Sequence, residues 1–183
     1  MKNVTRTIIF VLISTAMGFS ETPKQLGAWS VIPANGNLTS NHVVLLQSTS
    51  EEQHKDALGN VVQAKLDVIC KKGKLSAIAL EANVTIEKNV MDYRAALPTT
   101  RVAYTLGAQT EQFENWAVSD NGRTLSPYSE VFQGKLMRRW IERISNAKRR
   151  AFQLDGKAGE ALAQPTFATG DLLQALSSVG CSY

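Results

Sequence analysis

The stretch LDVICKKGKLSAIAL, residues 66–80, contains two apolar runs separated by Lys72-Gly73. A basic residue followed by glycine between such runs predicts a tight turn, so we expect a β-hairpin. The first run extends back to residue 61. Its apolar positions alternate with polar ones, apart from Ile69, at Ala64, Leu66, Val68 and Cys70. Alternation of period two buries one face of a strand and leaves the other in water, which is typical of an antiparallel sheet.

Cys70 ends the first run of the hairpin, and the only other cysteine is Cys181, close to the end of the sequence. In an oxidising compartment two cysteines that reach each other usually pair. We therefore expect a Cys70–Cys181 disulfide, which in the chain-entropy model stabilises the fold by about 4 to 5 kcal/mol. The alternative is a buried free Cys70 with an exposed Cys181.

The first twenty residues have the order of a secretory signal. Lys2 and Arg6 precede an apolar stretch over residues 7–19, and small residues follow. We expect cleavage after Gly18 or Ser20, with an uncleaved membrane anchor as the alternative. Removing residues 1–20 leaves 20 − 2 = 18 basic against 16 acidic side chains, a net charge of +2. This small charge argues against nucleic acid as a partner.

The rest of the chain, residues 21–183, has room for one domain. Strands are expected before Pro127 and helices after it. The expected strands cover residues 26–33, 42–50, 61–70, 75–87, 99–107 and 113–120. Apolar residues at three- and four-residue steps predict a helix over residues 129–148, capped by Ser129. Residues 149–156 are left as a strand or a loop, and residues 170–179 are expected as a short terminal helix. The predicted fold class is α+β, a sandwich-like antiparallel sheet with helix packed on one side.

The most unusual local feature is the basic segment 135–150, which carries seven arginines and lysines against Glu142 alone. Its net charge is +6, so the rest of the mature chain is about −4. The partner-binding residues that we predict on this helix are Lys135, Arg138, Arg139 and Arg143. Such a helix suits an acidic partner or an anionic membrane surface. The alternative is an apolar stripe in the core with charges that are merely solvated.

No constellation in the sequence supports catalysis, a cofactor or a metal ion. His42 and His54 are the only imidazoles, and neither has the neighbours that a zinc site needs. Ser119-Asp120 lacks the strand-turn-helix context of a hydrolase nucleophile. We therefore expect a non-enzymatic protein without cofactor or metal. Aromatic side chains on the predicted strands are expected mainly in the core, with a carbohydrate or peptidoglycan platform as the alternative.

The order AWSV, LDVICKKGKLSAIAL, RVAYTLG, ENWAVSDNGRTL, VFQGKLMRRW and PTFATGDLLQALSSVGCSY resembles the type VI secretion-associated accessory proteins called TagO or VasI. The resemblance covers about residues 27–183. The matching positions are Trp29, Cys70, Tyr104, Trp116, Ser119, Phe132, Leu136, Phe167, Leu172, Ala175, Leu176 and Cys181. It implies an exported domain of strands followed by helix, with a strand cysteine and a cysteine just before a terminal aromatic residue.

Together these features predict a periplasmic or secreted accessory protein that binds another envelope or secretion-system protein. Peptidoglycan and an anionic membrane surface are the other contacts considered. The alternative function is a periplasmic inhibitor or immunity protein that blocks a secreted hydrolase by inserting a loop, either residues 51–60 or residues 121–126.

Overall fold

The computed structural model describes residues 23–34, 43–55, 60–88, 91–93, 96–106, 111–128, 133–155 and 161–183. The expected signal segment, the cap Ser129 and the imidazole His42 lie outside these residues. The strands in chain order are β1 (Lys24–Leu26), β2 (Trp29–Ala34), β3 (Val43–Thr49), β4 (His54–Lys55), β5 (Val61–Val62), β6 (Lys65–Lys71), β7 (Lys74–Glu81), β8 (Thr99–Leu106), β9 (Gln112–Val118), β10 (Thr124–Pro127), β11 (Arg149–Asp155), β12 (Ala161–Ala163) and β13 (Thr166–Ala168). The helices are α1 (Gln133–Ser145) and α2 (Leu172–Ser178).

The hairpin predicted from residues 66–80 is confirmed as β6 and β7. Lys72 and Gly73 both have positive φ, 53° and 70°. Positive φ at both central residues is the geometry of a type I′ turn, whose twist matches that of the flanking strands. The alternating positions Ala64, Leu66, Val68 and Cys70 are at most 2% exposed, so the predicted face is the buried one.

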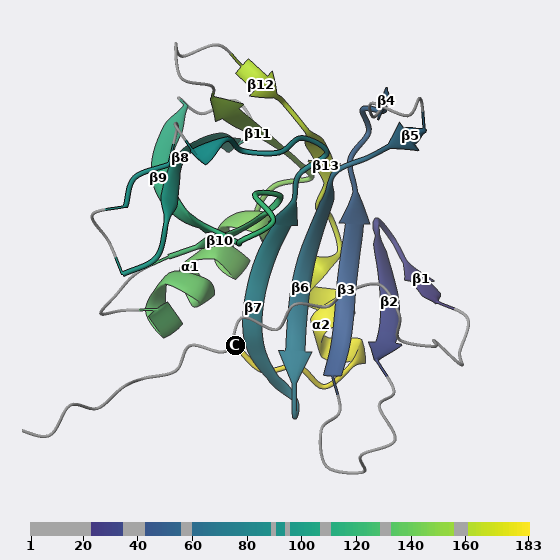
Figure 1. The fold of residues 1–183 in the computed structure, drawn as a ribbon. Helices are drawn as coiled ribbons and strands as arrows, with labels where there is room; N and C mark the ends of the chain where they lie inside the picture. Colours follow the sequence, from purple (N-terminus) through teal and green to yellow (C-terminus); the bar gives the residue numbers. More distant parts are fainter. Residues whose placement is uncertain are drawn as a thin grey trace, which may run out of the picture.

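Most of the described strands form one antiparallel sheet in the order β1-β2-β3-β6-β7-β10-β9-β8-β11-β12, and β13 pairs with β11. The sheet curls back on itself, so that β13 lies beside the end of β3. Ser50, which directly follows β3, forms a bridge with Phe167 of β13. The N–H of Glu51 donates to the carbonyl of Thr166 at 2.8 Å, and the Ser48 hydroxyl donates to the carbonyl of Ala168 at 2.8 Å. Figure 1 shows the two halves of the sheet joined through β13. The predicted α+β class with an antiparallel sheet is confirmed. The sheet was expected to be sandwich-like, and in the structure strand pairing connects its two halves.

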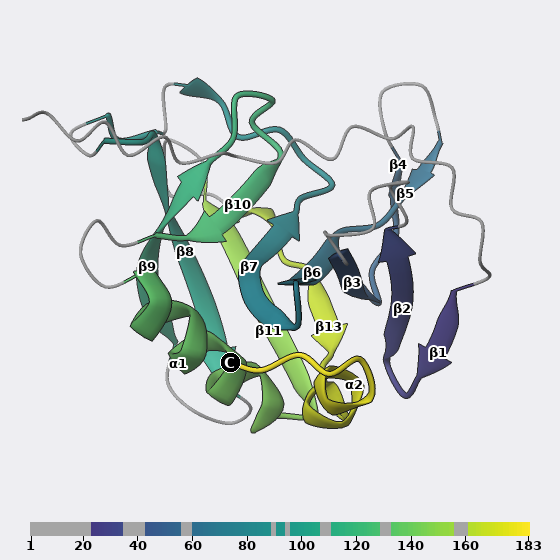
Figure 2. The same ribbon diagram turned by 90° about the horizontal axis from the view of Figure 1, so that it is seen from below.

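The two helices lie side by side at the same end of the curled sheet, as seen in Figure 2. The predicted helix is present, but it ends at Ser145 and not at Lys148. Lys148 instead accepts a hydrogen bond from the N–H of Thr169 at 2.9 Å, and Ala147 accepts one from the Thr169 hydroxyl at 2.7 Å. The chain leaves the helix because residues 149–155 pair with β8 on one side and with β12 and β13 on the other. Backbone pairing therefore makes this segment a strand.

An aromatic cluster fills the space between α1 and the sheet. Trp140 of α1 packs against Tyr104 and Trp116, with ring centroids 4.7 and 5.0 Å apart. Phe152 continues the cluster toward Phe167 at 5.9 Å. All five side chains are at most 2% exposed. Large, interlocking aromatic rings of this kind dominate core energetics, so they fix α1 on the sheet.

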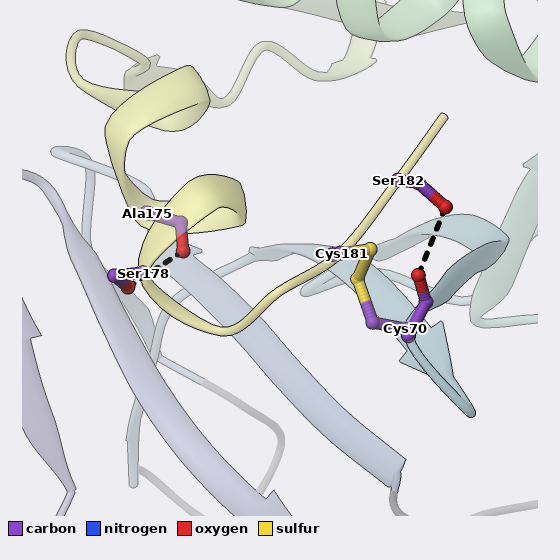
Figure 3. The surroundings of a disulfide bond; sticks show 6 residues. Cys70, Ala175, Ser178, Cys181 and Ser182 are labelled. Atoms are coloured by element: carbon purple, nitrogen blue, oxygen red, sulfur yellow. Dashed lines mark hydrogen bonds between the residues drawn. A yellow bond between two sulfur atoms is a disulfide. The ribbon is translucent and has the colours of Figure 1, made fainter.

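The predicted disulfide between Cys70 and Cys181 is present, and its Cα atoms are 6.0 Å apart (Figure 3). Backbone bonds reinforce it. Ser182 N–H donates to the carbonyl of Gly73 at 2.9 Å, and Leu75 N–H donates to the carbonyl of Ser182 at 2.8 Å. The end of the chain is thus attached to the central hairpin both covalently and by main-chain pairing.

Candidate functional site

Helix α1 presents an exposed basic face formed by Lys135, Arg138 and Arg139, three of the four predicted partner-binding residues. We call these three residues the basic face. The opposite side of the helix carries Met137, Trp140, Ile141 and Ile144, which are 0 to 6% exposed. The nearest acidic side chain on the helix is Glu142, 4.0 Å from Arg138 Nε, and both side chains are about 60% exposed. Exposed pairs of this kind contribute little, so Arg138 remains accessible to a partner.

Arg143, the fourth predicted residue, occupies a different environment. Its Nη1 donates to Glu114 Oε1 of β9 at 2.5 Å, and the two side chains are only 21% and 23% exposed. Its guanidinium carbon lies 5.5 Å from the ring centre of Tyr104 and 5.4 Å from that of Trp140. Arg143 therefore belongs to an internal cluster that holds α1 on the sheet.

Glu114 is the centre of that cluster. Its second oxygen accepts a hydrogen bond from Trp140 Nε1 at 2.9 Å. The Tyr104 hydroxyl lies 3.3 Å from Glu114 Oε1 and 3.0 Å from Gln112 Oε1, and its single proton serves one of these two acceptors at a time. The pKa of Tyr104 is raised to about 12, mainly by burial and secondly by the negative charge of Glu114. The raised pKa extends the pH range in which the phenol stays protonated and acts as a donor. We call Glu114, Arg143, Trp140 and Tyr104 the Glu114 cluster.

Arg150 belongs to the basic segment in sequence, but its side chain is buried and only 2% exposed. It lies on the same face of β11 as Phe152 and Leu154, which are also buried. The period-two alternation of residues 150, 152 and 154 is a signal that could have placed it inward. The pKa of Arg150 is lowered to about 10, mainly by desolvation and secondly by the positive charge of Arg143.

The remaining charges of the basic segment are also separated in space. Arg149 is exposed and forms an ion pair with Glu51 through both its Nε and Nη2. Lys148 is exposed at the turn into β11. The +6 segment is therefore divided among a solvent-facing helix surface, an internal ion pair, a buried arginine and an exposed ion pair, and it does not act as one patch.

Ser119 and residues 121–126 have structural roles, whereas residues 56–59 of the other candidate loop, residues 51–60, lie outside the described residues. The Ser119 hydroxyl donates to Asn121 Oδ1 at 2.5 Å and accepts from the N–H of Thr124, so it organises a turn. The same turn is held against the preceding segment, because Gly122 accepts from the N–H of Ile86 and Arg123 accepts from that of Ala82, both at 2.7 Å. Residues 121–126 therefore do not present a free loop. Within the described ranges no three metal-ligating side chains gather, and no helix has the length and apolarity to cross a bilayer.

A pocket of about 600 Å³ lies over β8, β11 and the segment 162–166. Its polar lining includes Glu52, Glu111, Thr105, Gln153 and Gln164. The Glu52 carboxylate accepts a hydrogen bond from the N–H of Thr166 at 2.6 Å, and Gln164 donates to Gln153 at 2.9 Å. Glu52, Gln153 and Gln164 are thus occupied in holding β13 and β12 in place.

Comparison with known protein families, with curated proteins and with solved structures finds no match to this chain. What the protein does is therefore inferred from its own residues.

Proposed function

We propose that the protein is a non-enzymatic, exported accessory protein that binds an acidic surface of another envelope protein through the basic face of α1. One observation carries this proposal. Lys135, Arg138 and Arg139 point to solvent from a helix whose entire apolar side is fixed in the core. Charge complementarity of this kind steers association and selects partners. The resemblance to type VI secretion-associated proteins motivates the place in the cell envelope, and the disulfide is consistent with an oxidising compartment.

An acidic protein surface is a better partner than a membrane. A helix that lies on a bilayer inserts its apolar face among the acyl chains. In α1 that face consists of Met137, Trp140, Ile141 and Ile144, which are packed against the sheet. Insertion would require α1 to leave the core, whereas docking onto an acidic protein requires no rearrangement.

Charge reversal tests the proposal. The double variant Arg138→Glu, Arg139→Glu should lose salt-sensitive capture of an acidic envelope protein, while its Tm stays close to that of the unaltered protein. The matched control is Lys71→Glu, Lys74→Glu, which makes the same charge change at exposed positions beside the hairpin turn. Capture should survive in the control, and the captured protein, once purified, should bind with the same variant pattern.

Two results would contradict the proposal. Equal loss of capture in both double variants would mean that only net charge matters. Tight binding of the unaltered protein to phosphatidylglycerol vesicles, abolished by the α1 substitutions, would make an anionic membrane surface the partner.

A further inference from the structure

The pocket over β8, β11 and the segment 162–166 combines room for a ligand with charges of one sign. Its volume of about 600 Å³ lies in the range of small-molecule sites. Ala103, Ala151 and Ala163 line it, and their short side chains leave space above the sheet. Among the described residues that line the pocket, the only charged side chains are Glu52 and Glu111. The pocket is therefore suited to a cationic ligand.

The middle of the pocket is a row of small side chains across three strands. Thr105 of β8 pairs with Ala151 of β11, and Ala151 pairs with Thr166 of β13. Paired residues share a face of the sheet, and successive residues of a strand alternate between faces. Phe152 and Phe167, the chain neighbours of this row, are buried in the core. The row therefore lies on the outer face of the sheet, where a ligand can reach it.

The two carboxylates of the pocket belong to opposite ends of this row. Glu111 directly precedes β9, and the register of β9 with β8 places it beside Thr105. Glu52 is at the other end, where its Oε2 accepts a hydrogen bond from the N–H of Thr166 at 2.6 Å. Neighbouring strands are about 4.8 Å apart, so the backbones at Glu111 and Thr166 are separated by about 14 Å. The row thus has a negative charge at each end and none between.

Neither charge is compensated within the described part of the chain, where no ion pair includes Glu52 or Glu111. The cation that affects Glu52 is Arg149, which is paired with Glu51. A neutral N–H holds the Glu52 carboxylate in position but leaves its charge in place. Burial opposes ionisation of Glu52, yet hydrogen bonds from Thr166 outweigh it and lower the pKa of this carboxyl. Both ends of the row are therefore available to an ammonium group.

We propose that this pocket binds a linear aliphatic polyamine, with one terminal ammonium group at Glu52 and the other at Glu111. Hydrogen bonds between an ammonium and a carboxylate are strengthened by charge. The aliphatic chain between the ammonium groups would lie over Ala151 and against Leu162, which bury apolar surface without requiring a polar partner. A ligand with a single ammonium group reaches only one carboxylate, so the arrangement selects for cations with charges at both ends.

This site is separate from the basic face in both residues and chemistry. The basic face carries positive charges and suits a large acidic surface, whereas the pocket carries negative charges and suits a small cation. The two proposals therefore succeed or fail independently.

Isothermal titration calorimetry of the full mature protein tests the site with spermidine, putrescine and butylamine at constant ionic strength. Spermidine should bind most tightly, because its length best matches the separation of the carboxylates. Butylamine should bind at least about tenfold more weakly, because it loses one charged contact. Absence of spermidine binding, or equal binding of butylamine, would overturn the proposal. Tighter binding of trilysine than of spermidine would make a basic peptide the ligand and would also overturn it.

A charge variant locates the binding. Glu111 is exposed, so Glu111→Gln should keep the fold. Its Kd for spermidine should increase about tenfold, while its Kd for butylamine changes less. The matched control Glu87→Gln removes one negative charge at an exposed position outside the pocket and should bind spermidine like the unaltered protein. Equal weakening in both variants would show nonspecific attraction of cations and overturn the proposal.

A size variant tests the space itself. Ala151→Leu keeps every charge but places a larger side chain in the middle of the row. It should weaken spermidine binding at least as much as Glu111→Gln does, with a Tm that shows the protein still folded. Unchanged spermidine binding in a folded Ala151→Leu protein would place the ligand elsewhere and overturn the proposal.

Discussion

Glu114 on β9 and Arg143 on α1 form an ion pair with a 2.5 Å contact between Oε1 and Nη1. The positive residues of α1 therefore lie in two different environments. Arg143 faces the sheet and stabilises the helix position, while Lys135, Arg138 and Arg139 face solvent. The helix can therefore offer charges to a partner without losing the contacts that hold it to the sheet.

The Glu114 cluster predicts a strong dependence of stability on one carboxylate. Glu114→Ala leaves Arg143 and the Trp140 indole N–H without their acceptor, whereas the Tyr104 hydroxyl keeps Gln112 Oε1 at 3.0 Å. The free energy of unfolding should fall by about 2 to 4 kcal/mol, because a partly buried cation loses its counterion. Urea denaturation measures this change. A double-mutant cycle with Arg143→Met should show coupling between the two residues, and strictly additive effects would contradict the cluster.

The disulfide predicts a large effect from a pair of small substitutions. The bond joins residues 111 apart in sequence. The variant Cys70→Ser, Cys181→Ser should therefore lose about 3 to 5 kcal/mol of unfolding free energy, mainly because its unfolded chain gains freedom. Adding a reductant to the unaltered protein should produce a similar fall in Tm. The control Ser182→Ala removes only the exposed hydroxyl bond to Gly73, and it should change stability by less than about 1 kcal/mol.

Asp67 predicts a specific pH dependence. Burial between β3 and β7 raises its pKa to about 6 from an ordinary 3.8, despite a hydrogen bond from Gln47 and with Glu81 and Lys65 as the charged neighbours. The folded state therefore binds a proton more tightly than the unfolded state. The contribution of Asp67 to stability should increase as the pH falls from 7 to 4, by about 1 to 3 kcal/mol.

The variant Asp67→Asn tests this dependence by urea denaturation across the same pH range. It should be more stable than the unaltered protein at pH 7, and the difference should shrink toward pH 4. The exposed Asp120→Asn serves as the control and should keep the original slope. A stability difference for Asp67→Asn that does not change with pH would contradict the raised pKa of Asp67.

Two glycines predict opposite effects of the same substitution. Gly122 has φ +69°, and an added Cβ would lie 2.9 Å from the Ile86 carbonyl oxygen. Gly122→Ala should cost about 1 to 3 kcal/mol, because the left-handed backbone and the close contact both oppose a side chain. Gly134 lies in α1 with nothing within 4 Å of an added Cβ. Gly134→Ala should stabilise the protein by about 0.5 to 1 kcal/mol. Thermal unfolding of both variants is the measurement, and equal shifts would contradict the difference in backbone conformation.

Much of the sheet could be predicted from local patterns. Alternation in residues 64–70 and the Lys72-Gly73 turn depend on neighbouring residues only, and both are confirmed. The disulfide followed from there being two cysteines. Strand β10 was missed because its four residues are too few for a periodic signal, and β12 and β13 for the same reason. The helix end was placed three residues late, because strand pairing with β8 and β13 takes over the chain from Arg149.

The sequence by itself determined the fold class, the hairpin, the apolar stripe of α1 and the identity of the cysteine pair. These features depend on the order of apolar and polar residues along the chain and on there being only two cysteines. Only the tertiary structure decided which positive charges meet solvent. Arg143 and Arg150 differ from Arg138 and Arg139 because β9 supplies Glu114 to one and β8 encloses the other. Desolvation depends on what lies across the fold, so no local pattern contains it.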